Sequence, residues 1–124
     1  GVTLIEAQRL IRKLCPRCRE AAQPPKELLE RLGEASIPAG ATFFRPKGCH
    51  FCNGVGYRGR MGIIEVVLID EHVRGLIVSK AQSWELKKYA VEKLGMTTLR
   101  QDGLKKAAAG ITTIEEVLRV TSEE

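Results

Sequence analysis

The sequence predicts an α+β fold, in which a small module with short β-strands is followed by a C-terminal helical bundle. Three observations support this prediction. Two Cys-x-x-Cys pairs flank a stretch of 30 residues, in the spacing C-x2-C-x30-C-x2-C. An Ile- and Val-rich run from Met61 to Ile69 is typical of a strand. From Asp70 onward, short apolar stripes follow residues that favour helix N-termini, which indicates a compact set of helices.

The cysteines are the most informative residues. Two close pairs on separate loops can each offer two thiolates to one tetrahedral ion. The spacing therefore predicts a zinc-stabilised module whose ligands are Cys15, Cys18, Cys49 and Cys52. The alternatives are two disulfides, which indicate an exported protein, a redox Cys-x-x-Cys, or unrelated buried thiols. His50 lies inside the second pair and is expected to face solvent, because four thiolates already complete the site.

The elements before the second pair follow from apolar spacing and helix caps. Thr3 with Glu6 resembles a capping box, and residues 4–14 carry apolar side chains at helical spacing. We therefore expect a helix that runs into Cys15, where Pro16 ends it. A second, short helix is expected over residues 26–32, followed by loop and by a short strand over 42–45.

The segment after Cys52 is rich in glycine and leads into the expected strand 61–69. It lacks the residue order of a phosphate-binding loop, so a turn followed by a bulged hairpin is the preferred interpretation. Asp70 and Ser83 are predicted N-caps of the next two helices. The last two helices are predicted to begin with capping boxes, Thr98 with Gln101 and Thr113 with Glu116, and Gly110 ends the first of them.

Composition and motifs limit the classes of function that this chain can have. The 124 residues are 44% hydrophobic and 28% charged, which fits one folded domain or two small modules and excludes wholesale disorder. Neither a membrane span nor a signal peptide is expected from the apolar runs. The formal net charge of +5 permits contact with nucleic acid or an anionic membrane, but the charges are scattered and favour a solvated surface. No catalytic constellation is present, and a closed four-thiolate site leaves no position for activating water.

Three stretches resemble the C-terminal end of the secretion ATPases of type II secretion and type IV pilus assembly. The first is the run AQRLIRKLCPRC, residues 7–18. The second is GCHFCNGVGYRGRMGIIE, residues 48–65. The third is GMTTLRQDGL, residues 95–104, with GITTIEEVLRVT, residues 110–121, following it. Together they cover nearly the whole chain, in the order of the family.

The resemblance implies a division into three segments. Residues 1–14 would end a RecA-like motor domain, residues 15–62 would form its tetracysteine zinc-binding module, and residues 63–124 would form a strand and a C-terminal helical subdomain. In that family the motor is a homohexamer at the cytoplasmic face of the bacterial inner membrane, where it meets platform proteins and uses ATP with Mg²⁺. This chain lacks the Walker A motif, so catalysis is expected only in the parent motor domain. The same resemblance makes Cys15, Cys18, Cys49 and Cys52 the zinc ligands.

Two other functions compete with this interpretation. A nucleic-acid-binding zinc module would interleave basic residues with exposed aromatics, but only 5% of the residues are aromatic and Phe43-Phe44 suit a strand core. A chaperone-type zinc module is suggested by the run CHFCNGVG, residues 49–56, which matches one repeat of the cysteine-rich region of J-domain co-chaperones. The first cysteine pair lacks the glycines of that repeat. No direct contact with nucleic acid is therefore expected.

Overall fold

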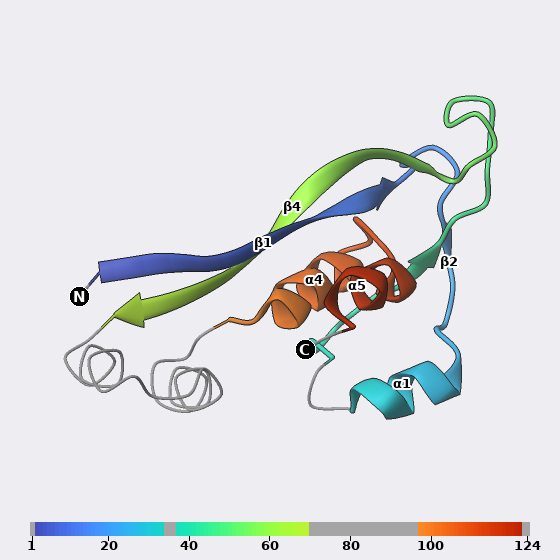
Figure 1. Cartoon of the computed structure of the whole chain (residues 1–124). Coiled ribbons are helices and arrows are strands. Elements are labelled where there is room, and N and C mark those ends of the chain that lie inside the picture. Colours follow the sequence, from blue (N-terminus) through green and yellow to red (C-terminus); the bar gives the residue numbers. More distant parts are fainter. Residues whose placement is uncertain (1, 34–36, 70–96, 123–124) are drawn as a thin grey trace.

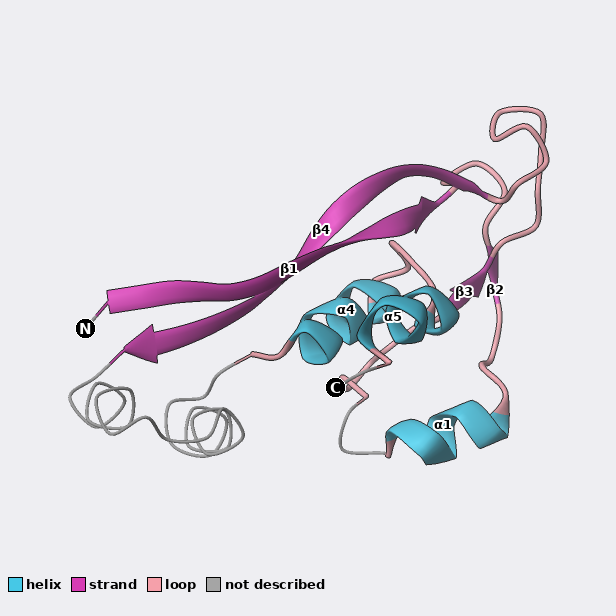
Figure 2. Cartoon of the chain, viewed as in Figure 1, coloured by secondary structure: helices cyan, strands magenta, loops and turns pink. Residues whose placement is uncertain are grey.

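The computed structural model of the chain describes residues 2–33, 37–69 and 97–122. Short antiparallel strands combine with helices, so the predicted α+β class is confirmed (Figure 1, Figure 2). The helices predicted from Asp70 and from Ser83 lie outside the described residues. In chain order the elements are β1 Val2–Leu14, β2 Glu20–Ala21, α1 Lys26–Leu32, β3 Phe44–Arg45, β4 Tyr57–Ile69, α4 Leu99–Ala108 and α5 Ile114–Thr121.

The long strands β1 and β4 pair antiparallel into a two-stranded ribbon. Ile11 lies opposite Met61, and Arg9 lies opposite Ile63. Directly opposed residues share a face of the ribbon, so Ile11 and Ile63 lie on the same side. Both are fully buried there and pack with Leu99. Helices α4 and α5 cover this side of the ribbon (Figure 1).

The prediction of a helix before Cys15 is wrong, because residues 2–14 form β1. Ala7 and Ile11 are four residues apart, which places them on one face of a helix but equally on one face of a strand. A register shift between Arg12 and Leu14 interrupts the regular ladder, and Leu14 is also buried. The apolar spacing was therefore compatible with both structures, and pairing with the Ile- and Val-rich β4 decided between them.

Both edges of the ribbon are hydrogen-bonded to the segments that begin the last two helices. On the β1 edge, the Arg12 N–H donates to Glu116 Oε1 at 3.1 Å, and Thr112 Oγ1 donates to the Arg12 carbonyl at 2.8 Å. On the β4 edge, the Ile64 N–H donates to Asp102 Oδ2 at 2.9 Å. These bonds satisfy backbone groups that an uncovered strand edge would leave open.

The caps of α4 and α5 follow the sequence in part. The box of Thr98 and Gln101 is confirmed, because both of its reciprocal hydrogen bonds form. At α5, Thr113 accepts from the Glu116 N–H, but the Glu116 side chain bonds to Arg12 instead of reaching back to the cap. Only half of the second predicted box therefore exists.

The main apolar core lies between α4 and α5, and its buried members are Leu104, Ala107, Ile114 and Val117. Helix α1 spans the predicted residues 26–32 and packs its leucines against this core. The predicted strand 42–45 is shorter, since β3 contains only Phe44 and Arg45. Because β1 pairs with β4, the expected segments 1–14 and 63–124 share one ribbon. Their assignment as separate domains, like the helical bundle, stays a prediction.

Among the described residues, no helix combines the length and the hydropathy that crossing a bilayer requires.

Candidate metal centre

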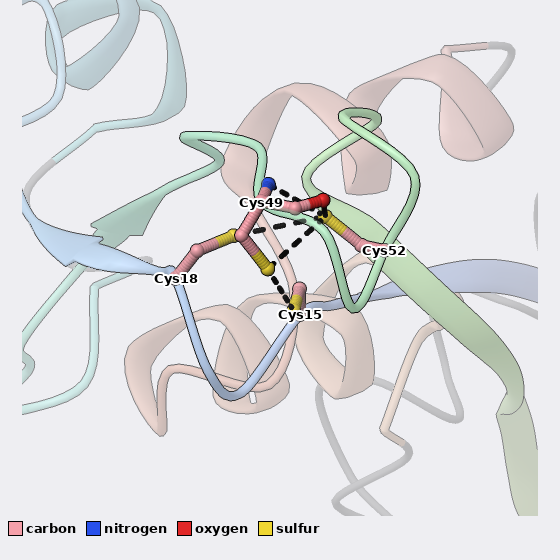
Figure 3. A group of neighbouring side chains, drawn as sticks. All are labelled: Cys15, Cys18, Cys49 and Cys52. Atoms are coloured by element: carbon pink, nitrogen blue, oxygen red, sulfur yellow. Dashed lines mark hydrogen bonds between the residues drawn. The ribbon is translucent and has the colours of Figure 1, made fainter.

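The four predicted cysteines come together where the ribbon ends. Cys15 follows β1 directly and Cys18 lies in the turn after it, while Cys49 and Cys52 lie in the loop that precedes β4 (Figure 3). Antiparallel pairing of β1 with β4 brings these two loops to the same end of the ribbon. The Cys15 N–H donates to the Gly56 carbonyl at 2.9 Å, which joins the two loops through the backbone.

The sulfur atoms have the spacing of a tetrahedral metal site. All four Sγ atoms lie within 4.8 Å of one another. The Sγ–Sγ distances are 3.7 Å for Cys15–Cys49, 3.8 Å for Cys18–Cys52 and 3.7 Å for Cys49–Cys52. Four ligands at a metal–sulfur distance of about 2.3 Å would stand about 3.8 Å apart. The residues present therefore fit one metal ion, and all four cysteines are free thiols.

Backbone N–H groups point at two of the sulfurs. Gly48 donates to Cys18 Sγ at 3.3 Å, while Cys49 and Gly56 each donate to Cys52 Sγ at 3.2 Å. Burial raises the pKa of Cys18 to about 11, and the Gly48 N–H opposes this shift only in part. Burial also opposes ionisation of Cys52, but the two N–H donors and the neighbouring thiols outweigh it and lower its pKa to about 6. The surroundings therefore favour the thiolate at Cys52 and disfavour it at Cys18.

Glycine is needed at two positions beside the sulfurs. Gly48 has φ +104°, and a Cβ there would lie 2.7 Å from the Gly54 carbonyl oxygen. Gly56 has φ +87°, and a Cβ there would lie 2.5 Å from Pro46 Cβ. Gly48, just before the second cysteine pair, and Gly56, in the glycine-rich segment after Cys52, therefore allow positive φ and close backbone approach.

The surroundings of the cysteines hold contacts that no sequence pattern indicated. The Phe51 ring is contacted by two guanidinium groups, Arg17 at 4.0 Å and Arg58 at 4.1 Å from the ring centroid. Arg58 also donates to the Phe51 carbonyl at 2.9 Å. His50 is exposed and does not belong to the cluster, as expected. The spacing of the cysteines predicted the cluster, but no sequence pattern around Phe51 predicted its contacts with the two arginines.

Three of the four cysteines are buried, and Cys49 is half-buried. Four thiolates complete a tetrahedral coordination shell, so the arrangement can hold a metal ion but offers it no vacant position for a water or a substrate. Chemically, the cluster can cross-link the two loops rather than catalyse a reaction.

Comparison with known proteins assigns the chain to a family. The protein family described as "Type II/IV secretion system protein" matches residues 1–119. The chain is 46% identical over 119 residues to a type IV pilus assembly ATPase PilB of Thermus thermophilus, covering 94% of this chain and 13% of that protein. It is 47% identical over 118 residues to a type II secretion system protein E of Dickeya dadantii, covering 95% and 23%.

A third relative, a type II secretion system protein E of Aeromonas hydrophila, is 48% identical over 122 residues, covering 95% of this chain and 23% of that protein. The chain thus spans less than a quarter of the length of each of these relatives. The family match nevertheless extends over almost all of its residues, the four cysteines included. The chain therefore belongs to the family of type II/IV secretion system proteins.

Proposed function

We propose that this chain is the zinc-binding C-terminal region of a hexameric motor ATPase that powers type II protein secretion or type IV pilus assembly. The observation that carries the proposal is the four-thiol cluster, with its tetrahedral spacing, in a family whose relatives are named as secretion proteins and pilus assembly ATPases. Its role is to stabilise a docking surface, while ATP and Mg²⁺ act in the parent motor domain.

Zinc is the ion that these ligands favour. Four thiolates in tetrahedral spacing select zinc or an iron–sulfur centre among the metals common in proteins. Zinc has no redox chemistry and suits a closed structural site, where its binding free energy contributes directly to folding. We assign the ion to Cys15, Cys18, Cys49 and Cys52.

A structural role follows from what the cluster connects. The loop of residues 46–56 contains no helix or strand, and its burial centres on the cysteines and Phe51. Helices α4 and α5, by contrast, have an apolar core of their own. Loss of the ion should therefore release the cysteine loops and leave the helices packed.

The partners are proposed from the family. Other subunits of a homohexamer and the inner-membrane platform proteins would meet the surface that the ion stabilises, at the cytoplasmic face of the membrane. We expect no direct role for nucleic acid. The alternatives, a nucleic-acid-binding or a chaperone-type zinc module, have no support from the names of these relatives.

The first test is metal content. Elemental analysis of the purified, reduced chain should find one zinc per molecule. Cys49→Ser should abolish binding of the ion at stoichiometric concentration, and His50→Ser, a change to the exposed neighbour, should retain it. A folded, reduced chain that holds no metal would contradict the zinc assignment.

The second test places Cys49→Ser and His50→Ser in the longer motor protein that the proposal requires. Nucleotide binding should survive Cys49→Ser, because the nucleotide site lies in the motor domain, whereas assembly or docking and hence secretion or piliation should fail. If Cys49→Ser removes nucleotide affinity while assembly and docking stay normal, the structural role is wrong.

A further inference from the structure

A groove beside the metal centre is lined by four arginines. It has a volume of about 680 Å³ and lies between β1, α5 and the segment that leads from Cys52 into β4. The arginines come from three separate parts of the chain, and the groove also contains exposed apolar side chains. Its main lining residues are Arg12, Arg58, Arg60 and Arg119, with Leu10 and Val55.

Two of the arginines are held in place by one buried carboxylate. Arg12 donates to Glu116 Oε2 from Nε at 3.2 Å and from Nη2 at 3.0 Å. Arg119 donates to both oxygens of the same carboxylate from Nε and Nη2. The Glu116 side chain is only 1% exposed, whereas those of Arg12 and Arg119 are 45% and 58% exposed. Glu116 thus holds both guanidinium groups from the buried side, while the arginine side chains remain about half exposed to solvent.

The groove carries unbalanced positive charge. Among the described residues, its four arginines face one carboxylate, the buried Glu116, which leaves a net charge of +3 from four positive groups and one negative group. Arg58 contacts Phe51 with one face of its guanidinium, which lies over the ring, and donates to the Phe51 carbonyl from Nη1. Within the described residues, the Arg60 side chain forms no hydrogen bond or ion pair, although it is exposed at the groove. Each guanidinium has five N–H donors, so several remain free for a ligand.

The same groove presents apolar surface. The side chains of Leu10 and Val55 are 54% and 58% exposed, and they are two of the three large hydrophobic residues most exposed in the described part of the chain. Oriented guanidinium groups bind carboxylates in forked, charge-assisted pairs, and an arrangement fixed in advance loses less entropy on binding. A ligand that matches this groove carries several carboxylates and apolar side chains together.

We propose that this groove binds an acidic segment of a partner protein, whose carboxylates pair with the arginines and whose apolar side chains contact Leu10 and Val55. A concave site suits a polypeptide better than the flat surface of a bilayer. A single-stranded nucleic acid would bind best where an exposed aromatic face lets its bases stack. The one aromatic ring in the groove, Tyr57, is already covered by the Arg12 guanidinium at 4.1 Å. The proposal concerns a surface distinct from the cysteines and does not depend on ATPase function.

Arg60→Glu in the full 124-residue, zinc-loaded chain tests this proposal. The probe is a short fluorescein-labelled peptide in which Asp and Glu alternate with Leu and Val, followed by fluorescence anisotropy. Reversing one charge in the groove should weaken binding by about tenfold, the loss expected for a charge-assisted pair. Arg60→Gln should weaken it less, and added salt should weaken binding of the unmodified chain.

The matched control is Arg31→Glu, which makes the same charge change on an exposed position of α1, outside the groove. It should leave peptide affinity close to that of the unmodified chain. Circular dichroism and metal content should be the same for all variants, because the exposed Arg60 side chain forms no hydrogen bond or ion pair among the described residues, and its backbone pairing with β1 does not depend on the side chain.

Three results would overturn the proposal. If both charge reversals weaken binding equally, the peptide responds to net charge and not to the groove. If neither does, or the peptide does not bind, the groove is not its site. If vesicles of phosphatidylglycerol bind in an Arg60-dependent manner and the peptide does not, the surface recognises a membrane instead.

Discussion

Replacing Glu116 by Gln should destabilise the chain, because one buried carboxylate joins α5 to β1. Its two oxygens accept five hydrogen bonds, three from Arg12 and two from Arg119. An amide has a single acceptor oxygen, so at least two of the five bonds must be lost. At about 1.5 kcal/mol for each bond to a charged group, the loss is about 3 kcal/mol.

The titration of Glu116 gives the same magnitude. Burial opposes ionisation, but hydrogen bonds from Arg119 and Arg12 outweigh it and lower the pKa of Glu116 from 4.5 to about 2. A shift of that size corresponds to about 3 kcal/mol. Because both arginines are about half exposed, water recovers part of this energy when the carboxylate is removed, and we expect a loss of about 2 kcal/mol.

Urea denaturation followed by far-UV circular dichroism measures this loss, with Glu115→Gln on the exposed side of the same helix turn as the control. A lowered folded-state pKa means that the ionised carboxylate stabilises the fold fully above pH 4.5. This contribution disappears as the pH falls towards 2. The difference between the unmodified chain and Glu116→Gln should shrink over that window, and loss of metal at low pH affects both proteins alike.

Glu116 does not stabilise the fold in this way if Glu116→Gln lowers the free energy of unfolding no more than Glu115→Gln does at pH 7. The same conclusion holds if the difference in stability between the unmodified chain and Glu116→Gln is independent of pH below 4.5.

Three further predictions concern the metal, the chemistry and the helix contact. Cys49→Ser should lower far-UV helicity only in part, because α4 and α5 pack on a core that excludes the cysteines; complete loss would show that the ion organises the whole chain. The chain should not hydrolyse ATP in an assay cleared of contaminating ATPases, since its sequence contains no Walker A motif, and turnover above background would contradict this. Gly103→Ala should destabilise the chain by about 1–2 kcal/mol in thermal unfolding, because a Cβ there would lie 2.6 Å from Val117 Cγ1; a raised melting temperature would mean that α5 moves aside easily.

The sequence was sufficient to predict the residues of the candidate site, but not the strand β1 that positions two of them. The cysteine spacing identified all four members of the cluster, because ligand pairs on two loops leave a mark that does not depend on the fold. The caps at Thr98 and Thr113 likewise predicted the start of α4 and α5, since the free backbone N–H groups of a helix N-terminus are hydrogen-bonded by residues nearby in the sequence. Such signals are local and survive in a single sequence.

The misassigned strand and the missed groove have a different origin. β1 is a strand because of its pairing with β4, whose partner residues lie 43 to 67 positions further along the chain. Glu116 looked like the second half of a capping box, yet its partner Arg12 is 104 residues away. Spacing within one segment carries no information about contacts at that separation, so only the folded structure could reveal them.

The pairing of β2 with β3 separates the metal site from the 22 residues that β2 and β3 enclose. Glu20 lies opposite Arg45 and Ala21 opposite Phe44, so the two ends of the segment 22–43 lie side by side. Within this segment, α1 contacts the α4–α5 core but no cysteine. The segment between β2 and β3 can therefore change in length or sequence among related proteins without moving the cysteines, because longer loops cost little closure entropy. Divergence of the family should concentrate there, except at the leucines that cover the core.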